Sequence, residues 1–224
     1  MPRGQSRTVI QRNPNLKTRK NISWLGFPLQ FIRKMRNASP FPTDRGLYEV
    51  LEYESILELK DKLGENAYFC KREKVRYLQN SIIAYQDQAW GDGDILLNYR
   101  CTPGTPVDRY RPGNRTYILI SLRNVRNKGD IDEFKIEWGI HKGFLRPSEL
   151  WETDVSHPTR QMTIQIVFPK MRPPTRVGLI ESNLRKTTSL SQEGISQYPD
   201  GRWLVKWETQ SVRLNEKYII EWDW

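Results

Sequence analysis

From residue 47 onward, apolar and polar side chains alternate with a period of two along the chain. In the clearest segment, 133–140, every second residue is apolar and most of the residues between them are charged. That period is typical of a strand with one buried face and one solvated face. The same alternation recurs at 162–168, 203–207 and 218–224. We therefore predict a strand in each of these four segments.

Earlier parts of the chain continue this pattern. Five further segments have the composition of strands: 47–60, 67–78, 82–87, 94–100 and 116–125. Short turns rich in Gly and Asp separate the segments, and no long stretch with a 3.6-residue period lies between them. A parallel α/β sheet is excluded, because each of its strands needs a crossover helix. The sequence predicts a mainly β protein, an antiparallel β-sandwich of one large or two small units.

The order of the strands and the Trp-rich ending resemble immunoglobulin-like sandwiches in outline. The Cys–Trp–Cys framework of a true immunoglobulin domain is missing, and a likeness of fold does not assign a function. Helix is expected only in short pieces, chiefly at 22–37 and 147–154.

Changes in composition divide the chain into four predicted regions. These are a basic N-terminal arm at 1–46 with a short apolar, helical segment at 22–37, a first β unit at 47–101, a Pro-, Gly- and Arg-rich loop or linker at 102–115, and a second β unit at 116–224. Residues 1–20 contain almost no large apolar side chains, so we expect the arm to be partly disordered. Two further breaks fall at 169–176 and 183–197.

The formal net charge of +10 is concentrated in the arm. Residues 1–40 contain no acidic residue and nine basic ones: Arg3, Arg7, Arg12, Lys17, Arg19, Lys20, Arg33, Lys34 and Arg36. The other 27 Lys and Arg face all 26 Asp and Glu, which leaves residues 41–224 with a formal charge of +1. A charge concentrated in this way is typical of a segment that meets a polyanion.

Several classes of protein are excluded by what the sequence lacks. Cys70 and Cys101 are too few for a disulfide scaffold, and without a CxxC or Cys/His cluster we expect no metal and no cofactor. The longest apolar stretch, 22–32, has about half the length of a membrane span, so we expect none. The arm also lacks the features of a secretory signal, which favours a cytoplasmic location, with an organellar transit peptide as the alternative.

The search for catalytic motifs returns one weak candidate. Glu133 and Lys135, with Asp108 or Asp130 upstream, match the acid-x-Lys element of metal-dependent nucleases. However, Glu133 and Lys135 also form the solvated face of the predicted strand at 133–140, which needs no active site. We therefore predict no catalytic residue and no enzymatic activity, and keep a nuclease as a distant third hypothesis.

The loop at 102–115 and its border hold three arginines, Arg109, Arg111 and Arg115, with Tyr110 among them. Guanidinium groups bind phosphate in a bidentate manner and tyrosine stacks on bases, so these residues are candidates for nucleic-acid binding. The alternative is that the arginines pair with Asp108 and nearby acids. The late tryptophans are a weaker candidate for a binding platform, because large aromatic residues on strands are more often part of a core.

Two functional hypotheses remain. In the first, the protein is a non-enzymatic component of a nucleoprotein assembly, whose basic arm binds the backbone of DNA or RNA while the β body contacts other protein subunits. In the second, it is a protein-interaction or regulatory β-sandwich without a role in nucleic-acid binding.

Overall fold

The computed structural model describes residues 46–190 and 194–224 of the 224-residue chain. The predicted arm at 1–46, with its helical segment and its nine basic residues, lies outside the described residues except for Gly46. The described part of the chain contains fourteen strands and no α-helix. Within these residues, no helix is long and apolar enough to cross a membrane. The prediction of a mainly β protein is confirmed.

The strands in chain order are β1 (Tyr48–Leu59), β2 (Asn66–Tyr77), β3 (Ile82–Ala89), β4 (Asp94–Thr102), β5 (Thr105–Tyr110), β6 (Thr116–Arg126), β7 (Ile131–His141), β8 (Ser148–Asp154), β9 (Thr159–Phe168), β10 (Arg176–Glu181), β11 (Lys186–Ser189), β12 (Ile195–Gln197), β13 (Trp203–Thr209) and β14 (Lys217–Asp223). In β7 the apolar positions are buried and the charged positions Glu133 and Lys135 are exposed, as the alternation predicts.

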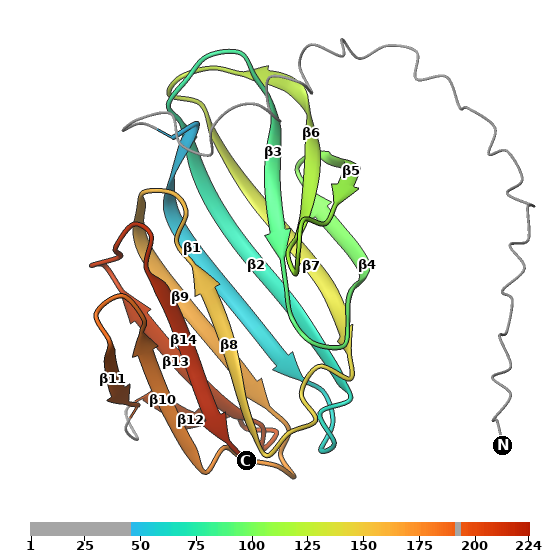
Figure 1. Ribbon diagram of the computed structural model, residues 1–224, viewed down its shortest axis with the longest axis vertical. Coiled ribbons are helices and arrows are strands. Elements are labelled where there is room, and N and C mark those ends of the chain that lie inside the picture. Colours follow the sequence, from blue (N-terminus) through green and yellow to red (C-terminus); the bar gives the residue numbers. More distant parts are fainter. Residues whose placement is uncertain (1–45, 191–193) are drawn as a thin grey trace, which may run out of the picture. The chain divides into compact units, whose positions relative to one another are not determined.

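Three sheets form from these strands. The orders are β12-β13-β9-β1-β2-β7-β4, β11-β10-β14-β8 and β3-β6-β5 (Figure 1). Phe134 of β7 stacks on Tyr85 of β3, with ring centroids 4.0 Å apart. On the same face of the large sheet, Phe69 lies opposite Trp138 and contacts Trp151 of β8 at 4.8 Å. Both small sheets therefore cover one face of the large sheet, and the described residues form a β-sandwich with a divided second layer.

One pair of strands departs from the antiparallel pattern. β1 and β9, in the centre of the large sheet, run parallel from the pair Val50–Thr159 to the pair Glu58–Val167. No crossover helix is needed, because the chain returns to the sheet through seven intervening strands. The other strand pairs are antiparallel.

The prediction of a helix at 147–154 is wrong. This segment is strand β8, which pairs with β14 from Ser148–Asp223 to Asp154–Lys217. Its side chains alternate, because Trp151 and Thr153 face the interior while Leu150 is 55% exposed. The gain from pairing with β14 and from packing Trp151 on Phe69 decides the conformation of this short segment.

The loop or linker expected at 102–115 contains strand β5, which pairs with β6. The large sheet takes strands from both sides of this segment, with β4 and β7 as neighbours. In the same way, the break at 183–197 contains β11 and β12. The six residues of β5 and the four of β11 are all exposed, which explains why no alternation marks them in the sequence.

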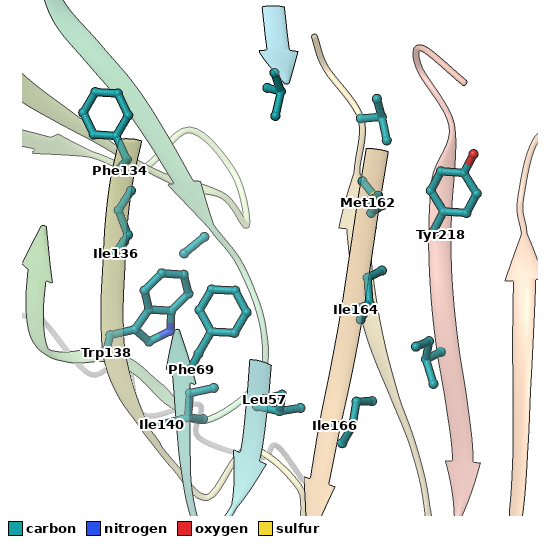
Figure 2. Packing of buried hydrophobic residues seen from close by; sticks show 14 of the residues in the cluster. Leu57, Phe69, Phe134, Ile136, Trp138, Ile140, Met162, Ile164, Ile166 and Tyr218 are labelled. Atoms are coloured by element: carbon teal, nitrogen blue, oxygen red, sulfur yellow. The ribbon is translucent and has the colours of Figure 1, made fainter. Parts of the chain in front are cut away.

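The core lies between the layers (Figure 2). Phe69 and Trp138 face each other across β2 and β7 with ring centroids 4.3 Å apart, and Ile164 and Ile166 extend the apolar layer along β9. Both isoleucines are completely buried. The alternating residues of the large sheet thus supply the greater part of the interior.

The turns at the carboxyl end of the chain are packed closely together. The indole Nε1 of Trp224 donates a hydrogen bond to the carbonyl of Arg146, at 2.8 Å. Gly64, in the β1–β2 turn, has φ of 73°, and a Cβ there would lie 1.7 Å from the carbonyl oxygen of Phe144. Only glycine allows the β1–β2 turn and the β7–β8 connection to approach this closely.

Candidate functional site

Strand β4 forms the edge of the large sheet and is irregular along its length. Its pairing with β7 shifts register twice, between Asp94 and Leu97 and between Leu97 and Arg100. Leu96 and Asn98 have positive φ angles of 64° and 53°, and the Leu96 side chain is buried. Positive φ is rare for leucine, and bulged edges with strained residues often accompany binding sites.

Strand β5, the edge of the three-stranded sheet, begins after a tight turn at Gly104. Gly104 has φ of 95°, and a Cβ there would lie 2.5 Å from Ile120 Cγ2 and 2.9 Å from the carbonyl oxygen of Ser121. This close approach brings β5 against β6, with Arg109 paired to Ile118 and Tyr110 to Tyr117. The Pro- and Gly-rich composition of the segment therefore builds a short strand that carries arginines at the sheet edge.

A hollow of about 490 Å³ lies beside these two edge strands. Its walls come from the β3–β4 turn, from residues 94–97 of β4, and from the end of β5 with Arg111 and the first residue of β6. Arg109, Arg111 and Asp94 are the charged residues among its walls. Together they carry a formal charge of +1, which suits a single bound anion.

Arg109 and Arg111 are available for a ligand. Among the described residues, neither guanidinium group has an ion pair or a side-chain hydrogen bond. Asp108 forms no ion pair with Arg109 in the described part of the chain, and its carboxylate accepts the backbone N–H of Arg109 at 2.8 Å. Both arginine residues are exposed. An exposed guanidinium keeps its full set of donors for phosphate or carboxylate oxygens.

Arg115 is placed differently from the other two arginines. Its guanidinium forms an ion pair with Asp154 and lies 4.1 Å from the ring centroid of Trp90. It also donates a hydrogen bond of 3.4 Å to the amide oxygen of Gln88. These contacts join the three-stranded sheet to β8, so the side chain of Arg115 already has a structural role.

Tyr110 lies at the hollow with its ring held in place. The hydroxyl donates to the amide oxygen of Gln86 at 3.0 Å, and the ring stacks on Tyr117 with centroids 5.3 Å apart. The side chain is 45% exposed. It therefore presents a fixed aromatic surface next to the two free arginines.

The residues of the nuclease hypothesis are not gathered into a site. Glu133 is exposed, and Lys135 forms an ion pair of 2.6 Å with Glu137. The Asp130 carboxylate accepts the backbone N–H of Asn127 at 2.8 Å and closes its own turn. In the described residues, no group of three His, Cys, Asp or Glu side chains has the geometry of a metal site. Cys70 and Cys101 are both free thiols there.

The late tryptophans belong mostly to the core. Trp222 is 1% exposed and packs edge-on against Phe168, with centroids 5.5 Å apart. Trp207 lies 4.9 Å from Tyr218, and Trp203 is partly buried against the same core. These rings thus pack mainly against the interior, and little of their surface is exposed to bind a ligand.

A buried ionic cluster lies between the large sheet and the three-stranded sheet, and sequence reasoning missed it. The ammonium of Lys71 lies 2.7 Å from Asp87 Oδ1 and 2.9 Å from Glu73 Oε2. The hydroxyls of Tyr85 and Tyr99 donate hydrogen bonds to Glu73 and Asp87 respectively. Lys71, Glu73 and Asp87 are all buried. The cluster thus joins β2 of the large sheet to β3 of the three-stranded sheet through buried ion pairs and hydrogen bonds.

The charges in this cluster support one another. Burial opposes ionisation of Lys71, but the carboxylates of Asp87 and Glu73 outweigh it and raise the pKa of Lys71 well above its usual value. Burial alone would raise the pKa of Glu73, whereas the charge of Lys71 and the hydroxyl of Tyr85 hold it below the usual value. Lys71 and Glu73 are therefore both ionised at neutral pH.

Stability is expected to fall as the pH is lowered from about 7 to about 5.5, because of His157. Burial lowers the pKa of this imidazole below 6.5, although Glu73 acts in the opposite direction, and the ring stacks on Tyr48 at 4.1 Å. The unfolded chain binds a proton near pH 6.5, so below that pH it holds more protons than the folded chain. The free energy of unfolding, measured in urea at each pH, should decrease toward acid.

The variant His157→Gln should show a smaller decrease over the same interval. His141→Gln is the matched control, because this ring lies in an exposed contact with the amide oxygen of Asn66, at 3.2 Å. An equal pH dependence in wild type and His157→Gln would contradict the assignment. The measurement stays above pH 5, where Glu73 remains ionised in the folded chain.

Comparison with known proteins gives a likeness of fold only. No family model matches the chain, and no curated protein matches it. A putative protease from Parabacteroides distasonis is similar in structure, with a TM-score of 0.46 and 11% identity over 81% of this chain and 41% of that one. An M1 zinc metallopeptidase from Deinococcus radiodurans has a TM-score of 0.43 and 10% identity, over 79% of this chain and 42% of that one. This chain thus spans about two fifths of their length.

Proposed function

We propose that the protein is a non-enzymatic component of a nucleoprotein assembly that binds the nucleic-acid backbone. The observation that carries this proposal is the pair of exposed arginines, Arg109 and Arg111, at a hollow of about 490 Å³ without a carboxylate partner in the described residues. The nine basic residues of the segment 1–40 supply the longer-range attraction. The hollow would bind one phosphate group, and the basic segment would bind further phosphates of the same nucleic-acid strand.

The salt dependence of binding tests this proposal. Each neutralised phosphate contributes a slope of about −0.9 to log K against log salt on duplex, or about −0.7 on a single strand. We expect about five to eight contacts, so deletion of residues 1–20 should remove roughly half of the slope. Affinity should vary little with base sequence, because contacts to the backbone carry no sequence information. Fluorescence anisotropy of labelled DNA and RNA oligonucleotides gives these slopes.

The double variant Arg109→Gln/Arg111→Gln tests the hollow itself. It should remove one or two further phosphate contacts and so make the slope less negative by about 0.7–1.8, with no change in folding. Arg123→Gln/Arg185→Gln is the matched control, since both arginines are exposed and have no carboxylate partner in the described part of the chain. Equal slopes for the two double variants would show that the hollow does not bind phosphate. Failure of the full chain to bind any nucleic acid at low salt would favour the protein-interaction module.

A further inference from the structure

Three connections meet at the end of the sandwich where the chain finishes: the β1–β2 turn, the β7–β8 connection and the β9–β10 turn. Arg172 of the β9–β10 turn donates a hydrogen bond to the carbonyl of Lys62, at 3.0 Å. Its guanidinium lies 3.4 Å from the ring centroid of Trp224, which is bonded to the carbonyl of Arg146. The three connections are therefore held together as one surface, which we call the loop end.

Each of the three connections exposes a large apolar side chain. Leu63 is 56% exposed, Leu145 is 53% exposed and Met171 is 76% exposed. Two other residues of this end contact the core instead, since Phe144 packs on Trp222 and Trp224 packs on Phe168. An exposed apolar group with a polar rim marks an interaction surface for protein or membrane.

The rim of the loop end carries three lysines. Lys62, Lys142 and Lys170 are exposed and have no carboxylate partner in the described residues. The carboxylate of Asp61 closes its own turn, since it accepts the backbone N–H of Leu63 at 2.9 Å and that of Asn66 at 2.8 Å. Each connection thus carries an exposed lysine close in sequence to its apolar tip, while Asp92 of the neighbouring β3–β4 turn pairs with Arg146 at 3.1 Å.

We propose that the loop end docks on an anionic lipid surface. Leu63, Leu145 and Met171 enter the boundary between headgroups and acyl chains, while the lysines contact lipid phosphates and keep their charges in water. Nucleic acid fits less well, because three aliphatic side chains would gain nothing from phosphates. A lipid surface deforms around projecting side chains, whereas a protein partner needs a complementary surface of about 800 Å² on each side. The residues involved differ from those of the nucleic-acid proposal, so each proposal stands or fails by itself.

Sedimentation of the full chain with lipid vesicles tests the docking. Wild type should bind vesicles of mixed phosphatidylserine and phosphatidylcholine and bind pure phosphatidylcholine weakly. The variant Leu63→Gln/Leu145→Gln/Met171→Gln keeps every charge, so the attraction of the basic segment 1–40 is unchanged. We expect it to lose at least about tenfold in partitioning, because about three partly inserted side chains lose their apolar transfer energy.

Val125→Gln/Leu184→Gln/Leu214→Gln is the matched control. These three residues are 51–53% exposed and lie in other turns or strand ends, so the control should partition like wild type. Lys62→Gln/Lys142→Gln/Lys170→Gln should lose about fivefold for each lysine on the anionic vesicles. The unfolding midpoint of each variant verifies that the fold is kept.

Three results would overturn the proposal. The loop-end apolar variant could bind like the control, which would assign binding to cations alone. Wild type could fail to bind anionic vesicles at low salt. Wild type could also dimerise without vesicles while the apolar variant stays monomeric, which would make the loop end a face for a second copy of the chain.

Discussion

Replacement of Lys71 by methionine is expected to lower the free energy of unfolding by about 3–5 kcal/mol. Methionine has a similar length, so little cavity forms, but Glu73 and Asp87 lose the cation that lies 2.9 Å and 2.7 Å from their carboxylates. Both carboxylates would remain buried with only tyrosine hydroxyls as donors. Urea unfolding with an unchanged m value would measure the loss.

The triple variant Lys71→Met/Glu73→Gln/Asp87→Asn separates charge from packing. It removes both uncompensated charges and keeps amide oxygens as acceptors for Tyr85 and Tyr99, so it should recover most of the lost stability. Lys74→Met is a control in the same strand, because its ion pair with Glu52 is exposed and is worth less than about 1 kcal/mol. A triple variant no more stable than Lys71→Met would refute the electrostatic explanation.

Gly64→Ala is expected to be the most damaging change at the loop end. The added Cβ would lie 1.7 Å from the carbonyl oxygen and 2.7 Å from the carbonyl carbon of Phe144, and both atoms belong to backbone. The β7–β8 connection would have to move away, which also disturbs the packing of Trp224. We expect a loss of about 3–5 kcal/mol, of which about 1–2 kcal/mol is the cost of positive φ in alanine.

Gly113→Ala isolates the conformational part of this cost. Gly113 has φ of 67°, close to the 73° of Gly64, and nothing lies within 4 Å of the added Cβ. The control should therefore lose only about 1–2 kcal/mol. Thermal or urea unfolding of both variants gives the difference, and equal losses would show that the turns at Gly64 separate without cost.

The long strands of the fold follow from the sequence, because their buried and exposed positions alternate. β7 is the clearest case, since its charged positions are exposed as predicted. The alternation fails where a strand has no buried face, as in β5 and β11, which are exposed along their whole length. It also fails for β8, whose conformation depends on pairing with β14, about seventy residues further along the chain.

The candidate site could be predicted only in part, since the sequence gives the same weight to Arg109, Arg111 and Arg115. The guanidinium of Arg115 is bound by Asp154, 39 residues away, and lies over the ring of Trp90. No local sequence pattern predicts these two contacts. The buried cluster did leave a signal, because Lys71 and Glu73 occupy inward positions between Phe69 and Val75 in a strand pattern. Their partner Asp87 comes from another sheet, which the sequence alone does not bring near them.

The parallel pair of β1 and β9 has a consequence for synthesis of the chain. About a hundred residues separate the end of β1 from the start of β9, so translation at about 5–20 residues per second leaves one edge of β1 open for about 5–20 s. An open edge is a template for pairing with another chain. Glu49, Glu52, Glu54 and Glu58 recur along β1, and their like charges oppose the pairing of two nascent β1 edges until β9 arrives.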